Sequence, residues 1–121
     1  MKKIEAIIRE EKLEPVKKAL EKAGILGMTV TQVSGRGRQK GIVLEWRAGE
    51  YRVDLLPKIK IEIVLEDENV TEAICAIKDS ARTGKAGDGK IFILPVENAI
   101  RISSGAEGSE VCQDSLVGNG K

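Results

Sequence analysis

The sequence predicts an α+β domain in which two copies of a β-α-β unit share one antiparallel sheet. Strand-like and helix-like apolar periods occur in the same order in both halves of the chain. The motif Lys3-Ile4-Glu5 recurs as Lys60-Ile61-Glu62, and each copy is followed by helical apolar positions at the same spacing: Leu13, Val16 and Leu20, then Val70, Ala73 and Ile77. Two such units give the ferredoxin-like arrangement, with two helices on one face of the sheet. The other face must be covered or polar, which favours oligomerisation.

The first unit is predicted from residues 3 to 33. Isoleucine-rich residues 3–9 indicate a strand. Pro15 is tolerated in a first helical turn, and the apolar period that follows continues to Ala23, where Gly24 and Gly27 end the helix. Residues 28–33, with alternating Thr and Val, indicate a second strand.

The second unit begins with strict alternation over residues 58–66, which is typical of a half-buried strand. Asn69 followed by Glu72 resembles a capping box, so we expect a helix from there to about Ala81. A strand over residues 90–96 and a short one over residues 99–103 complete the domain. Residues 104–121 are rich in Gly, Ser and Glu and are expected to form a flexible tail.

Composition narrows the class of protein. The 121 residues suit one domain, and 20 basic against 19 acidic residues give no general attraction to nucleic acid or membrane. No histidine supplies a general base or a metal ligand. Cys75 is expected to be small core filler, and Cys112 has no assigned role. Without an apolar leader or a membrane-spanning run, we expect a cytoplasmic protein.

The glycine-rich stretch from Thr83 to Phe92 lies between a predicted helix and a predicted strand. Gly84, Gly89 and Lys90 match the glycine and lysine positions of a P-loop, but Ile91 replaces the hydroxyl residue that binds Mg²⁺. The order of helix and strand is also reversed. Phosphate would therefore be held by backbone N–H groups and lysines instead of a helix N-terminus. A glycine-rich connection without chemistry is the alternative.

A second basic, glycine-rich stretch, residues 35–41, follows the second strand and opens a long loop. Its spacing does not fit a dinucleotide fingerprint, because the third glycine comes one position late and no helix follows. Glycines with Arg and Lys favour an anion site, and Gln39 adds an oxygen ligand for a hard cation. A solvated basic turn is the alternative. Arg101, also at a strand end, could converge on the same ligand.

These motifs resemble those of the PII nitrogen-regulatory signalling proteins, without gaps from Met1 to about Ser103. The stretch from Thr83 to Phe92 is similar to the family's C-terminal signature, the B-loop (about 82–90). Residues 35–41 and Leu56-Pro57-Lys58 flank the position of the long T-loop (about 37–55).

The resemblance implies a homotrimer with ATP or ADP, Mg²⁺ and 2-oxoglutarate bound in clefts between subunits. Implied nucleotide-binding residues are Thr29, Gly37, Arg38, Gln39, Gly87, Asp88, Gly89, Lys90 and Arg101. Implied 2-oxoglutarate-binding residues are Gln39, Lys40, Gly41 and Lys58, with Gln39 as the metal ligand. The implied function is a regulatory sensor, not an enzyme, whose T-loop reorders to control nitrogen-assimilation partners such as an ammonium transporter, an enzyme or a regulator.

At the T-loop apex, the resemblance makes Arg47 the partner contact and Tyr51 the modification candidate; an unmodified interface tyrosine is the alternative. Trp46 and Ala48-Gly49 depart from the family pattern, and Ser103 stands where members carry a second phosphate-contacting arginine. The alternative function is therefore a divergent regulator, with altered nucleotide or effector preference, that controls nitrogenase or carbon uptake. ATP hydrolysis lacks a histidine base, and RNA binding lacks a stacking pair of aromatics. Membrane contact is expected only through a transporter.

Overall fold

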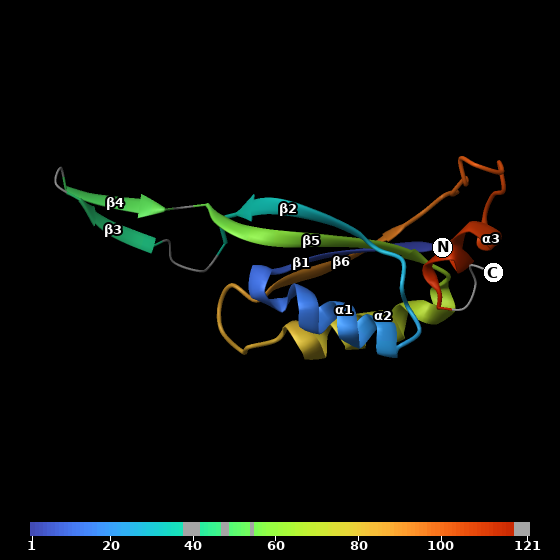
Figure 1. Ribbon diagram of the computed structural model, residues 1–121, viewed down its shortest axis with the longest axis horizontal. Coiled ribbons are helices and arrows are strands. Elements are labelled where there is room, and N and C mark those ends of the chain that lie inside the picture. The colour runs from blue at the N-terminus through green and yellow to red at the C-terminus, as the bar shows by residue number, and fades with distance from the viewer. Residues whose placement is uncertain (38–41, 47–48, 54, 118–121) are drawn as a thin grey trace.

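The computed structural model describes residues 1–37, 42–46, 49–53 and 55–117, and it confirms the ferredoxin-like arrangement (Figure 1). Four strands form one sheet in the order β2-β5-β1-β6, and every neighbouring pair is antiparallel. Helices α1 and α2 cover one face of this sheet (Figure 1). The two units are β1 (Lys2–Arg9), α1 (Leu13–Lys22), β2 (Thr29–Gly35) and β5 (Leu56–Leu65), α2 (Asp67–Ala81), β6 (Gly89–Pro95).

The core lies between the two helices and the central strands β1 and β5. Alternate residues of a strand point to the same face, so the isoleucines of both strands collect beneath the helices. Burial there removes each isoleucine from water and stabilises the fold by about 1.5–3 kcal/mol. The core residues include Ile4, Ala6 and Ile8 of β1, Ile59, Ile61 and Ile63 of β5, Val16 and Leu20 of α1, and Ala73 and Ile77 of α2.

The opposite face of the central strands carries a charge quartet, formed by Lys3, Glu5, Lys60 and Glu62. Lys3 pairs with Glu62, and Lys60 lies 4.0 Å from Glu5 and 3.7 Å from Glu62. The two cross-strand pairs are related by the internal repeat, because Lys3 and Glu5 recur as Lys60 and Glu62. The sequence predicted that this face is either covered or polar, and on the central strands it is polar, with matched charges.

Helix α2 begins earlier than the sequence predicted. Its first residue is Asp67, and Glu66 precedes it in an extended conformation, with no side-chain hydrogen bond to the helix end. The backbone N–H of Asn69 donates to the Glu66 carbonyl oxygen over 3.0 Å. The predicted capping box at Asn69 is therefore wrong. Asp67 and Glu68 instead place negative charge at the positive end of the helix dipole.

The segment predicted to be a long loop contains regular structure. Strand β2 extends to Gly35, β5 begins at Leu56, and β3 (Ile42–Trp46) pairs with β4 (Gly49–Val53) in an antiparallel hairpin. Figure 1 shows this hairpin reaching beyond the end of the four-stranded sheet. The expectation of an irregular middle was therefore wrong, because β3 and β4 pair their backbone hydrogen-bonding groups with each other instead of with the main sheet.

The C-terminal predictions also need correction. Residues 99–103 form no strand: Ile100 makes an isolated bridge to Glu107, and the backbone turns sharply at residues 102–104. The expected flexible tail is structured through residue 117, with helix α3 (Ser109–Cys112) and a 3₁₀ turn, Gln113–Ser115. Cys112 is buried and Cys75 is exposed, so the prediction that Cys75 fills the core was wrong.

Candidate functional site: a cationic groove at the glycine loop

The glycine loop, residues 83–89, connects the end of α2 to the start of β6. Three of its glycines have positive φ: Gly84 at +87°, Gly87 at +99° and Gly89 at +106°. A Cβ on Gly89 would lie 1.7 Å from the Ile7 carbonyl oxygen, so only glycine lets β6 begin against β1 here. The predicted order, a helix followed by a strand, is confirmed.

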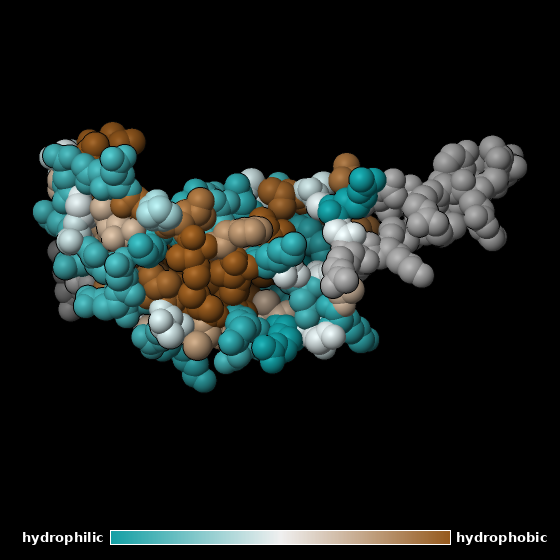
Figure 2. All heavy atoms as spheres, turned by 180° about the vertical axis from the view of Figure 1, so that it is seen from behind, coloured by the Kyte–Doolittle hydropathy of each residue, from teal (hydrophilic) through white to brown (hydrophobic). Residues whose placement is uncertain are grey.

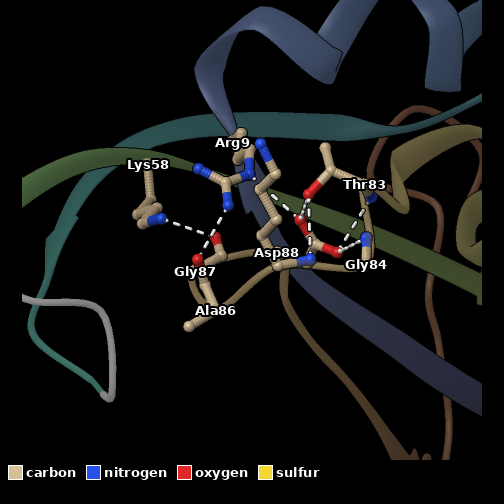
Figure 3. A network of polar contacts seen from close by, with 8 residues as sticks. Arg9, Lys58, Thr83, Gly84, Ala86, Gly87 and Asp88 are labelled. Carbon is tan, nitrogen blue, oxygen red and sulfur yellow. Dashed lines mark hydrogen bonds and ion pairs between the residues drawn. The ribbon is translucent and has the colours of Figure 1, made fainter.

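Asp88 organises this loop from within (Figure 3). Its carboxylate accepts hydrogen bonds from the backbone N–H groups of Thr83 and Gly84 at 2.9 and 2.8 Å, and from the Thr83 hydroxyl. Arg9 Nε donates to the same carboxylate over 3.0 Å. The Thr83 hydrogen bonds, more than any other contact, hold the pKa of Asp88 far below its usual range. Asp88 is therefore ionised, and its carboxylate oxygens accept hydrogen bonds that hold the loop in shape.

Two cations hold the loop against the sheet. Arg9 Nη2 donates to the Ala86 carbonyl oxygen over 2.8 Å, and Lys58 Nζ donates to that of Gly87 over 2.7 Å. Figure 3 shows both side chains reaching the loop from neighbouring strands, β1 and β5, where the two residues are paired in register. Burial, then the charge of Arg9, lowers the pKa of Lys58. Arg9 was not among the residues predicted from the sequence; its place at the end of the first predicted strand was the available signal.

A groove of about 570 Å³ lies between this loop and the ends of β2 and β5. Its volume falls within the range of small-molecule sites. Of the residues that the structure describes, four cationic side chains line it, those of Arg36, Lys58, Lys85 and Lys90, and one carboxylate does, that of Asp88. The groove therefore suits an anionic ligand. Among the described residues, it brings together six predicted site residues: Gly37, Lys58, Gly87, Asp88, Gly89 and Lys90.

Thr29 and Arg101 lie away from this groove. Thr29 is opposite Glu62, four residues along β5 from Lys58, or about 13 Å at the usual rise of a strand. Arg101 follows the far end of β6 and pairs with Asp114. The predicted residues 38–41 and Arg47 lie outside the described residues; Tyr51 belongs to β4, but its side chain is not described.

Fold and groove together define a ferredoxin-like domain with a cationic groove beside a glycine loop. The family model of the nitrogen regulatory protein P-II matches residues 1–106. Proteins with that name from Azospirillum brasilense and Rhodospirillum rubrum are 56% and 54% identical over 110 residues, which cover 91% of this chain and 98% of each relative. Nitrogen regulatory protein P-II 2 of Methanothermobacter thermautotrophicus is 58% identical over 91% of this chain and 96% of its own length.

The chain belongs to the P-II family, which confirms the resemblance inferred from its motifs. Members of this family are regulatory proteins, as the chain was predicted to be, and not enzymes. Within the described residues, no helix is both long enough and apolar enough to cross a membrane.

Proposed function

We propose that the chain is a sensor of the ATP/ADP ratio and of 2-oxoglutarate, and that it controls nitrogen-assimilation partners through residues 37–55. The observation that carries this proposal is the cationic groove at the glycine loop. Both the nucleotide phosphates and 2-oxoglutarate are polyanions, and backbone amides with lysine and arginine side chains are the groups that bind such ligands.

The described residues fit a phosphate chain. Gly87 and Gly89 let the backbone approach a ligand closely, while Lys90 and Lys85 supply positive charge. Mg²⁺ fits less directly, because the Asp88 carboxylate already accepts four hydrogen bonds within the domain. The metal would therefore be held by Gln39 and phosphate oxygens. Its chemistry there would be to join the nucleotide to the 2-oxoglutarate carboxylate.

A nucleotide that also touches Thr29 and Arg101 needs a second subunit, since these residues lie away from the glycine loop of the same chain. We therefore propose a homotrimer with a shared site in each cleft. The edge strand β6 supports assembly, because its Phe92, Ile93 and Leu94 are large apolar residues that remain exposed. Figure 2 shows apolar side chains gathered in the middle of one face of the chain.

2-Oxoglutarate would be held by Lys58 together with the backbone near residues 39–41. Lys58 suits this role because its ammonium group lies at the groove and already contacts Gly87 of the glycine loop. Effector binding would thus be coupled to the loop that holds the nucleotide. The hairpin β3–β4 would be the partner-binding region, where Arg47 would contact an ammonium transporter and Tyr51 is the modification candidate.

Isothermal titration tests this function. We expect 2-oxoglutarate to give binding heat in the presence of MgATP and none with ADP, because the effector must reach the nucleotide-bound metal. Lys58→Gln should weaken 2-oxoglutarate binding about 10- to 100-fold, the effect of losing a charged hydrogen bond. Lys18→Gln, on the exposed side of α1, removes the same charge and should change nothing. Absence of 2-oxoglutarate heat with MgATP would contradict the proposal.

A further inference from the structure

The C-terminal segment, Ser109–Val117, is docked on the connection between α1 and β2. Its own Cys112 is 3% exposed, and its Leu116 forms an isolated bridge with Ile25. Three backbone hydrogen bonds join the segment to the connection: from Leu26 and Gly27 to the Ser115 carbonyl oxygen, at 2.8 and 3.1 Å, and from Val117 to that of Gly24, at 2.8 Å. The segment is therefore a packed element with defined contacts.

The docked segment holds the side chain of Arg101. Nε and Nη2 of the guanidinium donate to the two carboxylate oxygens of Asp114 at 2.9 and 2.7 Å. Nη2 also donates to the Glu110 carbonyl oxygen at 3.4 Å, and Nη1 donates to the Ser104 hydroxyl at 3.2 Å. The pKa of Asp114 is lowered chiefly by its hydrogen bonds with Arg101. All three guanidinium nitrogens therefore have protein acceptors.

A phosphate group would need the donors that Asp114 uses. Arginine binds carboxylate and phosphate with the same planar pair of N–H groups, so the two acceptors compete for one fork. The segment also borders Thr29, because Val111, Cys112 and Asp114 line a hollow together with that residue. Both residues expected at the far half of the nucleotide site are thus next to the C-terminal segment.

We propose that Asp114 is an intramolecular competitor of nucleotide phosphate for Arg101, and that nucleotide binding loosens the C-terminal segment. This inference rests on the proposed nucleotide site. Asp114 lies beyond residue 106, where the match to the family model ends. The competition sets nucleotide affinity without any direct contact between Asp114 and the nucleotide.

Nucleotide titration of Asp114→Asn tests the competition. We expect MgATP and ADP to bind about two- to fivefold more tightly than in the wild type, which is the range for loss of one partly exposed ion pair. Asp79→Asn is the matched control, because Asp79 is an exposed aspartate of α2 and its replacement changes the net charge equally. The control should bind like the wild type.

The thiol of Cys112 reports segment release independently of binding heat. In a Cys75→Ser background, which removes the exposed thiol, we would follow the reaction with a disulfide reagent. Burial both shields Cys112 and raises its pKa, so the docked segment should react slowly. Saturating nucleotide should accelerate the reaction, and Asp114→Asn should accelerate it without nucleotide.

The outcomes separate this inference from the proposed function. Equal nucleotide affinity in Asp114→Asn and Asp79→Asn, or a Cys112 rate that nucleotide leaves unchanged or lowers, would overturn the competition alone. No nucleotide binding by the wild type or by Asp114→Asn would overturn both the proposed function and the competition defined against it.

Discussion

Replacing Gly89 with alanine should be far more disruptive than replacing Gly84, although both glycines belong to the same loop and both have positive φ. A left-handed conformation costs a non-glycine residue about 1–2 kcal/mol, and this cost applies to both variants. Only Gly89 adds a clash, because its new Cβ would lie 1.7 Å from the Ile7 carbonyl oxygen and 2.7 Å from its carbon.

The clash at Gly89 cannot be relieved by a side-chain rotation, since both atoms that it meets are backbone atoms. The start of β6 must move away from β1, which leaves a backbone group unsatisfied at a further cost of about 1–3 kcal/mol. We therefore expect Gly89→Ala to lower the free energy of unfolding by about 2–5 kcal/mol. Gly84→Ala should cost only about 1–2 kcal/mol, because nothing lies within 4 Å of its new Cβ.

Urea unfolding followed by far-UV circular dichroism, at equal protein concentrations, measures both values. With a slope of about 1–3 kcal/mol per molar urea, the two midpoints should differ by about 1 M. Equal midpoints for the two variants would refute the argument, because the conformational cost alone would then account for Gly89. A normal midpoint for Gly89→Ala would show that β6 can begin without the close approach to Ile7.

Three other changes test the glycine loop, the nucleotide preference and the C-terminal segment. The pKa of Asp88 is lower in the folded than in the unfolded chain, so its ionised form stabilises the fold at pH values above the ordinary carboxyl range. This contribution shrinks as pH falls below about 4. The urea unfolding midpoints of the wild type and of Asp88→Asn should therefore converge in acid. Ser103→Arg should strengthen ATP binding more than ADP binding in competition titrations, and an unchanged ratio would make Ser103 irrelevant to nucleotide preference. In Gly27→Ala, the new Cβ would lie 2.9 Å from Ser115 Cα. This clash should push the C-terminal segment away and raise the thiol reactivity of Cys112. Gly24 is not a suitable control position, because its positive φ would strain any substitution there.

The central part of the fold could be predicted because its apolar periods coincide with its burial. Ile4 and Ile61 are equivalent in the two repeats, and both are fully buried beneath the helices. The false strand at residues 99–103 shows where such patterns fail. Ile100 and Ile102 alternate with Arg101 as in a strand, yet they are 61% and 100% exposed, and within the described part of the chain Ile100 makes only an isolated bridge to Glu107. Alternating apolar residues indicate which face of a strand would be buried, but they do not show that another strand is there to pair with it.

The glycine loop could be predicted from the sequence, but the side chain that fixes it could not. Glycines and lysines mark the loop at residues 83–89, whereas the side chain that fixes it from β1 comes from Arg9, 79 positions before Asp88. Composition likewise suggested flexibility after residue 103, although Asp114 pairs with Arg101 and Ser115 accepts backbone hydrogen bonds from the α1–β2 connection. Contacts between distant parts of the chain determine the structure of both regions, and such contacts cannot be predicted from local composition.

Competition for Arg101 fixes both the direction and the size of two linked effects, the one of docking on nucleotide affinity and the one of nucleotide on docking. If docking of the C-terminal segment weakens nucleotide binding by some factor, nucleotide must weaken docking by the same factor, since binding free energies are reciprocal. A two- to fivefold effect of Asp114→Asn on affinity therefore predicts that nucleotide opens the segment only partially, so that Cys112 becomes about two- to fivefold more reactive.

Comparing the two factors locates the competing contact. Equal factors would assign the whole competition to the Asp114–Arg101 pair. A larger effect of nucleotide on Cys112 would mean that the segment also opposes nucleotide next to Thr29, where Val111 and Cys112 line the hollow. Opposite signs, with Asp114→Asn binding nucleotide more tightly while nucleotide protects Cys112, would violate reciprocity for a single docking equilibrium and exclude the competition.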